Sequence, residues 1–173
     1  TKRLTTNQSR LKELEATGRE RVTKRESAGL LTIVHELLTL KPDRPEVQKL
    51  MAQLEKRDAD LLDVRDATIK QATQQLGEQQ YAETLATLNA VSEEVWNAQL
   101  EDLKTKASDL LNQLNILRDS IASAVNGNQL KGLLPIVEEC LTLKADQDDL
   151  VKLKEQLEKR DADLLEARDV AIK

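Results

Sequence analysis

The apolar residues of this chain recur at steps of three and four, which is the spacing of one face of an α-helix. The cleanest such stripe consists of Trp96, Leu100, Leu103, Ala107, Leu110, Leu114, Leu117, Ile121 and Ala124. A second stripe occupies positions 45–76, between a proline and Gly77, and that glycine is expected to end the helix. The spacing therefore predicts long helices over 45–76 and 93–125, with Ser92 capping the second.

Shorter stretches between these stripes are apolar on most sides, as is typical of helices buried between other helices. They cover positions 28–40, 78–91 and 130–143. Pro135 lies early in the third stretch, so that helix is expected to start late or to kink. With a first helix over 1–28 and a last helix over 147–173, the predicted order is long, short, long, short, long, short, long.

The chain also contains an internal duplication with a period of 103 residues. Positions 29–70 align with 132–173, and 27 of the 42 aligned residues are identical. A diverged hairpin at 78–125 lies between the two copies. The pattern predicts one helical repeat array over 1–173, built of antiparallel hairpins as an α-solenoid or an elongated bundle. Both ends fall inside predicted helices, so we expect a fragment of a longer array with open end faces.

Composition agrees with an all-α fold, because only five Gly and three Pro are present, too few for the turns of an all-β protein. The core is expected to be almost purely aliphatic, since Tyr81 and Trp96 are the only aromatic residues. The single cysteine, Cys140, excludes an intrachain disulfide and favours a reducing compartment, the cytoplasm. No apolar run approaches the roughly 18 residues that a membrane span needs.

Charge narrows the choice of partner. The net charge of −5 comes from interleaved acids and bases, which argues against a general affinity for nucleic acid. The first 28 residues are the exception, with eight Lys/Arg against four Glu. This segment is either a basic patch for an acidic partner or one solvated helix face. The solvated face is favoured, because acids are interspersed and no aromatic side chain is present to stack on bases.

Few residues are candidates for chemistry. His35 is the only histidine, so a His-based metal site or catalytic triad is not expected, and we interpret it as a surface residue. Cys140 takes the place of Leu37 in the second copy and is interpreted as a small core residue rather than a reactive thiol. Trp96 is placed at the start of a helix, as a core residue or a wedge between hairpins. No catalytic, cofactor-binding or metal-ligating residue is predicted, and no cofactor.

The most conspicuous polar segment is an octet, EKRDADLL, which occurs unchanged at 55–62 and 158–165. Arg57 with Asp60, or Asp58 with Asp161, could line a groove that binds a partner once per period, and Arg65 with Asp66 repeats the Arg-Asp pair. The alternative is ion pairing on a helix surface, copied by duplication whatever its use. We favour the alternative, because such surface pairs contribute only about 0.3–0.5 kcal/mol each.

Two segments carry a family resemblance. Gly77, Tyr81, Ala82, Leu85 and Leu88 resemble the turn and second helix of a tetratricopeptide hairpin, and LLTLKPD at 37–43 resembles its closing segment. Every second helix is about twice as long here as in that family. The whole pattern also resembles helical repeat segments between the domains of large multidomain bacterial proteins.

These resemblances imply a function without chemistry, a structural spacer or a protein-binding scaffold. The alternative is a coiled-coil-like element that forms homo-oligomers through its end helices, and an enzyme is the least favoured reading. The expected partner is a protein or a second copy of the chain, rather than nucleic acid, a membrane or a small-molecule substrate.

Overall fold

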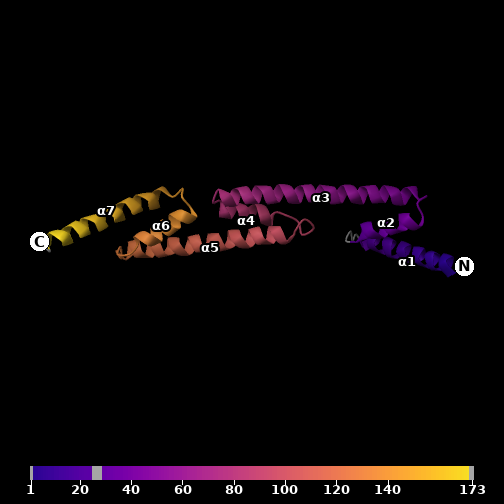
Figure 1. Cartoon of the computed structure of the whole chain (residues 1–173), viewed down its shortest axis with the longest axis horizontal. Coiled ribbons are helices and arrows are strands. Elements are labelled where there is room, and N and C mark those ends of the chain that lie inside the picture. The colour runs from indigo at the N-terminus through magenta and orange to yellow at the C-terminus, as the bar shows by residue number, and fades with distance from the viewer. Residues whose placement is uncertain (1, 25–28, 172–173) are drawn as a thin grey trace. The chain divides into compact units, whose positions relative to one another are not determined.

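A computed structural model describes residues 2–24 and 29–171 of the chain, and over these residues it consists of helices and their connections (Figure 1). The prediction of an all-α protein is confirmed. Long and short helices alternate in the order α1 (Lys2–Lys24), α2 (Leu30–Leu40), α3 (Pro45–Gly77), α4 (Tyr81–Asn89), α5 (Ala98–Asn126), α6 (Leu134–Leu143) and α7 (Asp148–Ala171). The part of the first predicted helix over 25–28 lies outside the described residues.

The chain divides into two compact units, and each is described by itself. The N-terminal unit, Thr1–Arg65, contains α1, α2 and the first part of α3. The C-terminal unit, Asp66–Lys173, contains the rest of α3 and the helices α4 to α7.

Several predicted boundaries are correct. The long helix predicted over 45–76 is α3, which ends one residue later, at Gly77. The third short helix starts late, as Pro135 predicts: α6 begins at Leu134 and holds the proline in its first turn. There the missing N–H of the proline costs no intrahelical hydrogen bond.

The start of α5 was predicted wrongly. The helix begins at Ala98 rather than at 93, and its N-cap is Asn97 rather than Ser92. The Asn97 side chain accepts a hydrogen bond from the backbone N–H of Leu100 at 2.9 Å, which satisfies one of the free donors of the first turn. The residues before it form a turn that buries Val95.

Gly77 does not supply the left-handed residue that ends α3. That residue is Gln79, with φ of 58°, and the N–H of Gln80 donates to the carbonyl of Gln75 at 2.9 Å. The end of α5 repeats this arrangement with Asn128, at φ of 51°. Both helices therefore end in a Schellman motif, in each case with an amide side chain at the position that glycine usually occupies.

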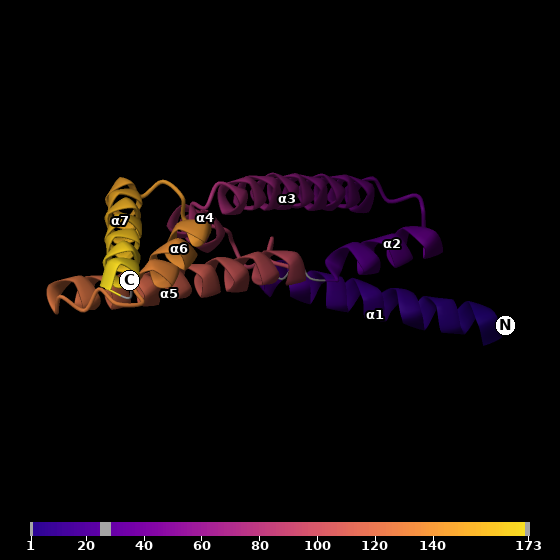
Figure 2. The ribbon, with the colours of Figure 1, turned by 60° about the vertical axis from the view of Figure 1, so that its left-hand side comes forward.

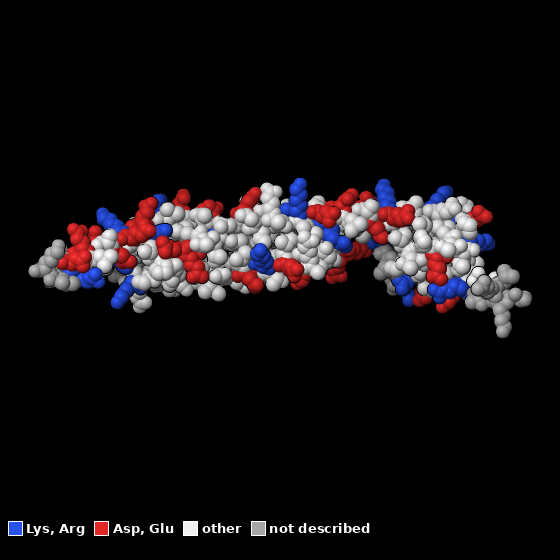
Figure 3. Space-filling model, in the orientation of Figure 1, with Lys and Arg blue, Asp and Glu red and all other residues white. Residues whose placement is uncertain are grey.

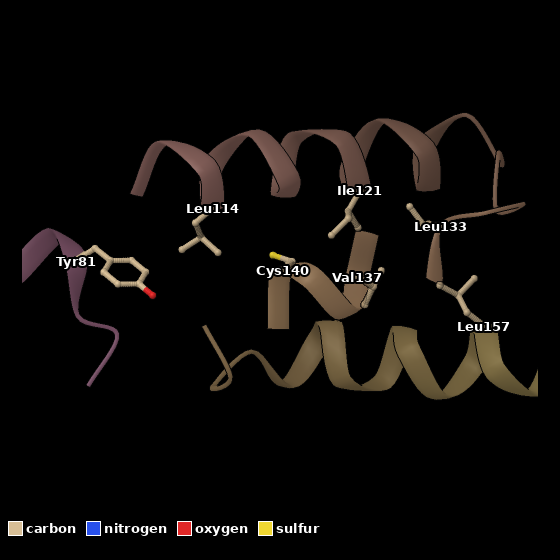
Figure 4. Packing of buried hydrophobic residues seen from close by; sticks show 7 residues of the cluster. All are labelled: Tyr81, Leu114, Ile121, Leu133, Val137, Cys140 and Leu157. Carbon is tan, nitrogen blue, oxygen red and sulfur yellow. The ribbon is translucent and has the colours of Figure 1, made fainter. Parts of the chain in front are cut away.

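Each unit has its own core of mainly aliphatic residues. In the N-terminal unit Leu30 and Val34 of α2 pack with Leu54 of α3. In the C-terminal unit α6 lies between α5 and α7 and contacts both (Figures 2 and 4). The core cluster of the C-terminal unit consists of Tyr81, Leu114, Ile121, Leu133, Val137, Cys140 and Leu157.

Positions 103 residues apart play the same part in the two cores. Gly29 and Gly132, which precede the short helices, both have a left-handed backbone, with φ of 71° and 72°. The buried residues of the first copy are Leu30, Val34, Leu37 and Leu54. Their counterparts Leu133, Val137, Cys140 and Leu157 are buried as well. The duplicated sequence thus specifies the same local packing twice.

In the C-terminal unit, Gln79 and Tyr81 hold the end of α6, and we call this pair the clamp. The Gln79 amide donates to the carbonyl of Thr142 at 3.2 Å and accepts from the N–H of Ala145 at 2.8 Å. The Tyr81 hydroxyl donates to the carbonyl of Leu143. The last carbonyls of a helix have no intrahelical donor, so the clamp supplies partners that α6 lacks.

The buried face of α6 predicts a large difference between two valine substitutions. Val137→Asp places an unpaired carboxylate where the side chain is 0% exposed, and should lower the free energy of unfolding by about 3–5 kcal/mol. Val151→Asp makes the same change at a site on α7 that is 40% exposed, and should change it by less than about 0.5 kcal/mol. Urea denaturation followed by circular dichroism measures both, and similar values would refute this assignment of the core.

The clamp predicts that the two left-handed residues with amide side chains, Gln79 and Asn128, contribute differently to stability. Gln79→Gly relieves backbone strain but removes two hydrogen bonds to the end of α6, so the unfolding free energy should fall by about 1–2 kcal/mol. Asn128→Gly, the matched control, should change it by no more than about 0.5 kcal/mol. Thermal melting compares them, and equal shifts for the two variants would show that the Gln79 side chain contributes nothing to the clamp.

Burial of Tyr81 predicts a loss of stability at alkaline pH. Burial raises the pKa of the Tyr81 phenol above its ordinary value of 10.0, because the charged form is poorly solvated there. The stabilisation is complete below pH 10 and is lost as the pH rises through the raised pKa of the folded state. Tyr81 is the only tyrosine, so tyrosinate absorbance reports its titration directly.

The control for this prediction is Tyr81→Phe, which should be less stable than the wild type near neutral pH. Its stability should lack the alkaline loss that is due to the phenol. An equal loss in both proteins would assign the effect to other groups.

Candidate interaction grooves

The first groove lies in the N-terminal unit, between α1, α2 and the start of α3, and has a volume of about 440 Å³. Its floor is formed by Leu30, Val34 and Leu37 of α2. Apolar walls come from Val22 of α1 and from Val47 and Leu50 of α3. The rim carries Glu15, Arg19, Arg44 and Glu46, so an apolar floor is bordered by charges of both signs.

The second groove lies in the C-terminal unit, between α5 and the start of α7, and has a volume of about 840 Å³. Its volume is larger than that of the first groove, but its lining contains Ile121 and no residue of the short helix α6. Its lining from α5 is Arg118, Ile121, Ala122 and Val125. From the α7 side come Asp146, Gln147, Asp148, Asp149 and Leu150.

The two grooves occupy equivalent places in the duplicated sequence. Each α5 residue of the second groove lies 103 positions after a residue of the first, namely Glu15, Gly18, Arg19 or Val22. The same shift relates Arg44, Glu46 and Val47 to Gln147, Asp149 and Leu150. The groove is therefore a recurring feature of the period rather than an accident of one surface.

A polar contact crosses each groove at equivalent positions. In the first groove the Arg44 guanidinium forms an ion pair with the Glu15 carboxylate. In the second groove Arg118 Nε donates to Gln147 Oε1 at 2.8 Å. The donor lies on the α3 side in the first copy and on α5 in the second, so the contact is kept while the residue types are exchanged.

A further contact recurs along the neighbouring short helix. Arg10 Nε of α1 donates to Glu36 Oε1 of α2 at 2.8 Å, and this partner lowers the pKa of the Glu36 carboxyl. In the C-terminal unit the equivalent residues Gln113 and Glu139 are joined at 3.2 Å. These groups are exposed to solvent, so they fix which surfaces meet more than they add stability.

The difference between the grooves traces to one position. Gly18 has no side chain, so the first groove reaches down to α2, whereas Ile121 at the equivalent site covers α6. A Cβ at Gly18 would lie 3.6 Å from Ile33 Cγ2, an ordinary van der Waals distance. Packing therefore permits a side chain here, and the helix would be more stable with one by about 1 kcal/mol.

The three residues that the sequence analysis considered for chemistry, His35, Cys140 and Trp96, do not line either of these two grooves. His35 is exposed on α2, as expected of a surface residue. Cys140 is fully buried in the core, in agreement with its interpretation. Trp96 does not start α5 but lies half-buried in the preceding turn, where Nε1 donates to Glu101 at 2.8 Å. The ammonium of Lys104 lies 5.3 Å from the centre of its ring.

The repeated octet includes a structural contact. Arg160 donates to the carbonyl of Leu130 at 2.9 Å and to Asp161 at 2.6 Å, so it holds the connection between α5 and α6. Asp58, Asp60 and Asp163 are exposed, and the linings of the two grooves contain other residues. Over the described residues, no group of three or more His, Cys, Asp or Glu is arranged to hold a metal ion.

The sequence pattern did not predict the grooves, because Gly18 stands out only as a residue type that is unfavourable within a helix. The signal was present: extending the 103-residue alignment upstream of Gly29 pairs Gly18 with Ile121 and Glu15 with Arg118. Only Leu11, Leu14 and Val22 are identical in that upstream part, which is why it did not stand out.

Comparison of the chain with protein-family models, with curated proteins and with solved structures gives no match. Among the helices of the described residues, none combines the length and the apolar character that a membrane crossing requires.

Proposed function

We propose that the chain is a non-catalytic helical repeat module, a spacer or protein-binding scaffold that holds protein partners in its recurring grooves. The observation that supports this most directly is the recurrence of one groove, with its polar contact, at positions 103 residues apart. The polar contact is kept although both of its positions differ in residue type between the copies, which simple copying by duplication does not explain.

The chemistry of the first groove suits a protein segment. Protein interfaces combine an apolar centre with a polar rim, and an amphipathic helix laid into a groove is a common form of recognition. Val22 is 50% exposed on the groove wall, which offers apolar area to a partner at little cost to the fold. Arg19 and Glu46 on the rim can then fix the direction in which the partner lies.

The proposal also includes an architecture, in which antiparallel helical hairpins stack as an α-solenoid. Long and short helices that alternate are what antiparallel hairpins of an α-solenoid would give, and matched contacts in the two copies support such stacking. In this reading the hairpins are tetratricopeptide-like, with lengthened second helices. A single buried cysteine is consistent with a reducing compartment such as the cytoplasm.

The second candidate function is self-assembly through the end helices. The exposed leucines of α7 favour it, since Leu164 and Leu165 are 61% and 54% exposed.

Selection of helical peptides from a displayed library tests the scaffold proposal. Binders selected on the wild-type chain should lose at least about tenfold in affinity on Gly18→Ile, which fills the groove as Ile121 does in the second copy. They should bind unchanged to Ile116→Lys, a matched surface change at a residue of α5 that is 66% exposed. Circular dichroism confirms that both variants fold.

Binders that ignore Gly18→Ile, or a selection that yields none, would contradict the proposal. Val22→Asp provides an independent change to the groove wall at an exposed position, and it should weaken the same peptides.

A further inference from the structure

The last part of α7 presents an apolar face that continues the core face of the same helix. Leu150 and Leu153 pack against the core cluster, and Leu157 is buried within it. Leu164 lies seven residues after Leu157, so it falls on the same side of the helix, yet it is 61% exposed. Leu165 lies beside it and is 54% exposed. The packed interface of α7 therefore runs on into a surface that lacks its cover.

The charge of this segment selects what can cover it. From Asp161 onward, α7 carries four acids, Asp161, Asp163, Glu166 and Asp169, against Arg168 alone. The lining of the first groove is balanced, with Arg19 and Arg44 against Glu15 and Glu46, but over residues 7–24 α1 carries five Lys/Arg against three Glu. On the face shown in Figure 3 acidic and basic side chains are interspersed, so the charge preference comes from the net charge of each segment rather than from a patch of one sign.

We infer that the first groove binds the 161–170 segment of α7 from a second copy of the chain, with Leu164 and Leu165 over the apolar floor. This rests on the proposed function, because it names the occupant of a groove that the function requires. Gly18 gives the leucines access to α2, and Arg19 on the rim faces the acidic side of the incoming helix.

The two other surfaces that could receive α7 are disfavoured by charge. The second groove carries Asp146, Asp148 and Asp149 against Arg118, so it repels an acidic helix, and Ile121 covers its floor. Pairing of α7 with α7 of another copy would bring two acidic segments together. Like charges cost energy when they are juxtaposed, whereas opposite charges speed and orient association.

The contact is heterologous, because it joins different surfaces of the two copies. Each assembled chain still has one free groove or one free α7, so assembly continues until a ring closes or growth stops. The attraction is partly electrostatic and weakens as salt shortens the screening length from about 10 Å at 0.1 M to about 3 Å at 1 M. Pairing of α7 with α7 would show the reverse dependence.

Sedimentation of the full chain at increasing concentration tests the inference. The average mass should rise with concentration at low salt and fall at 1 M salt. Leu164→Lys and Val22→Asp should each weaken association at least about tenfold, since each places a charge in the apolar centre. Ile116→Lys is the matched control and should associate as the wild type does. All three sites are exposed, so the fold is expected to survive, and circular dichroism verifies it.

Mixing the two defective chains gives the sharpest result. Leu164→Lys keeps an intact groove and Val22→Asp keeps an intact α7, so the mixture should form a 1:1 complex that grows no further. A single-chain mass at every concentration would overturn the inference, as would a closed dimer that strengthens with salt or a mixture without complex. Peptide binders that depend on Gly18 would, in that event, leave the proposed function standing.

Discussion

Burial of the short helices is the constraint on which the structure depends. Each of these helices has an apolar face that needs cover from neighbouring helices, whereas its polar residues, such as His35 of α2 and Glu139 of α6, remain exposed. In the C-terminal unit α6 obtains it from α5 and α7, and α4 contacts α5. A helix that covers two short helices in succession must be longer than either, which accounts for the 29 residues of α5. The length of α5 thus follows from the need to bury the apolar faces of α4 and α6.

The sequence pattern was sufficient to predict the alternation of long and short helices. Three-and-four spacing indicated the long helices, together with the proline that begins α3, and the dense apolar stretches indicated the short ones. It was insufficient at the start of α5, where Ser92 and Asn97 are both able to cap a helix. Burial of Val95 and the bond from Leu100 to Asn97 decide between them, and both depend on the folded chain. The end of α3 is a similar case. By residue type Gly77 is expected to supply the left-handed residue, but Gln79 supplies it.

The grooves were beyond the reach of single-sequence reasoning for a different reason. A groove needs two elements that are distant in the chain, here α1 and the start of α3, and no local pattern states their separation. Glycine is unfavourable within a helix, and the reason for Gly18 lies on the neighbouring helix α2. The comparison of copies supplied that reason, since Ile121 shows what a filled position looks like.

The exchange of residue types across the grooves bears on how a duplicated chain folds without error. Two copies that share 27 of 42 aligned residues can pack against the wrong partners, a recognised hazard of repeated sequences. If the start of α3 packed on α5, Arg44 would face Arg118, and two guanidinium groups would repel. Because the arginine lies on opposite sides of the groove in the two copies, packing of α3 on α5 is less favourable than packing of each helix within its own copy. Surface polar contacts that contribute little to stability can therefore still favour the correct pairing of helices over the crossed one.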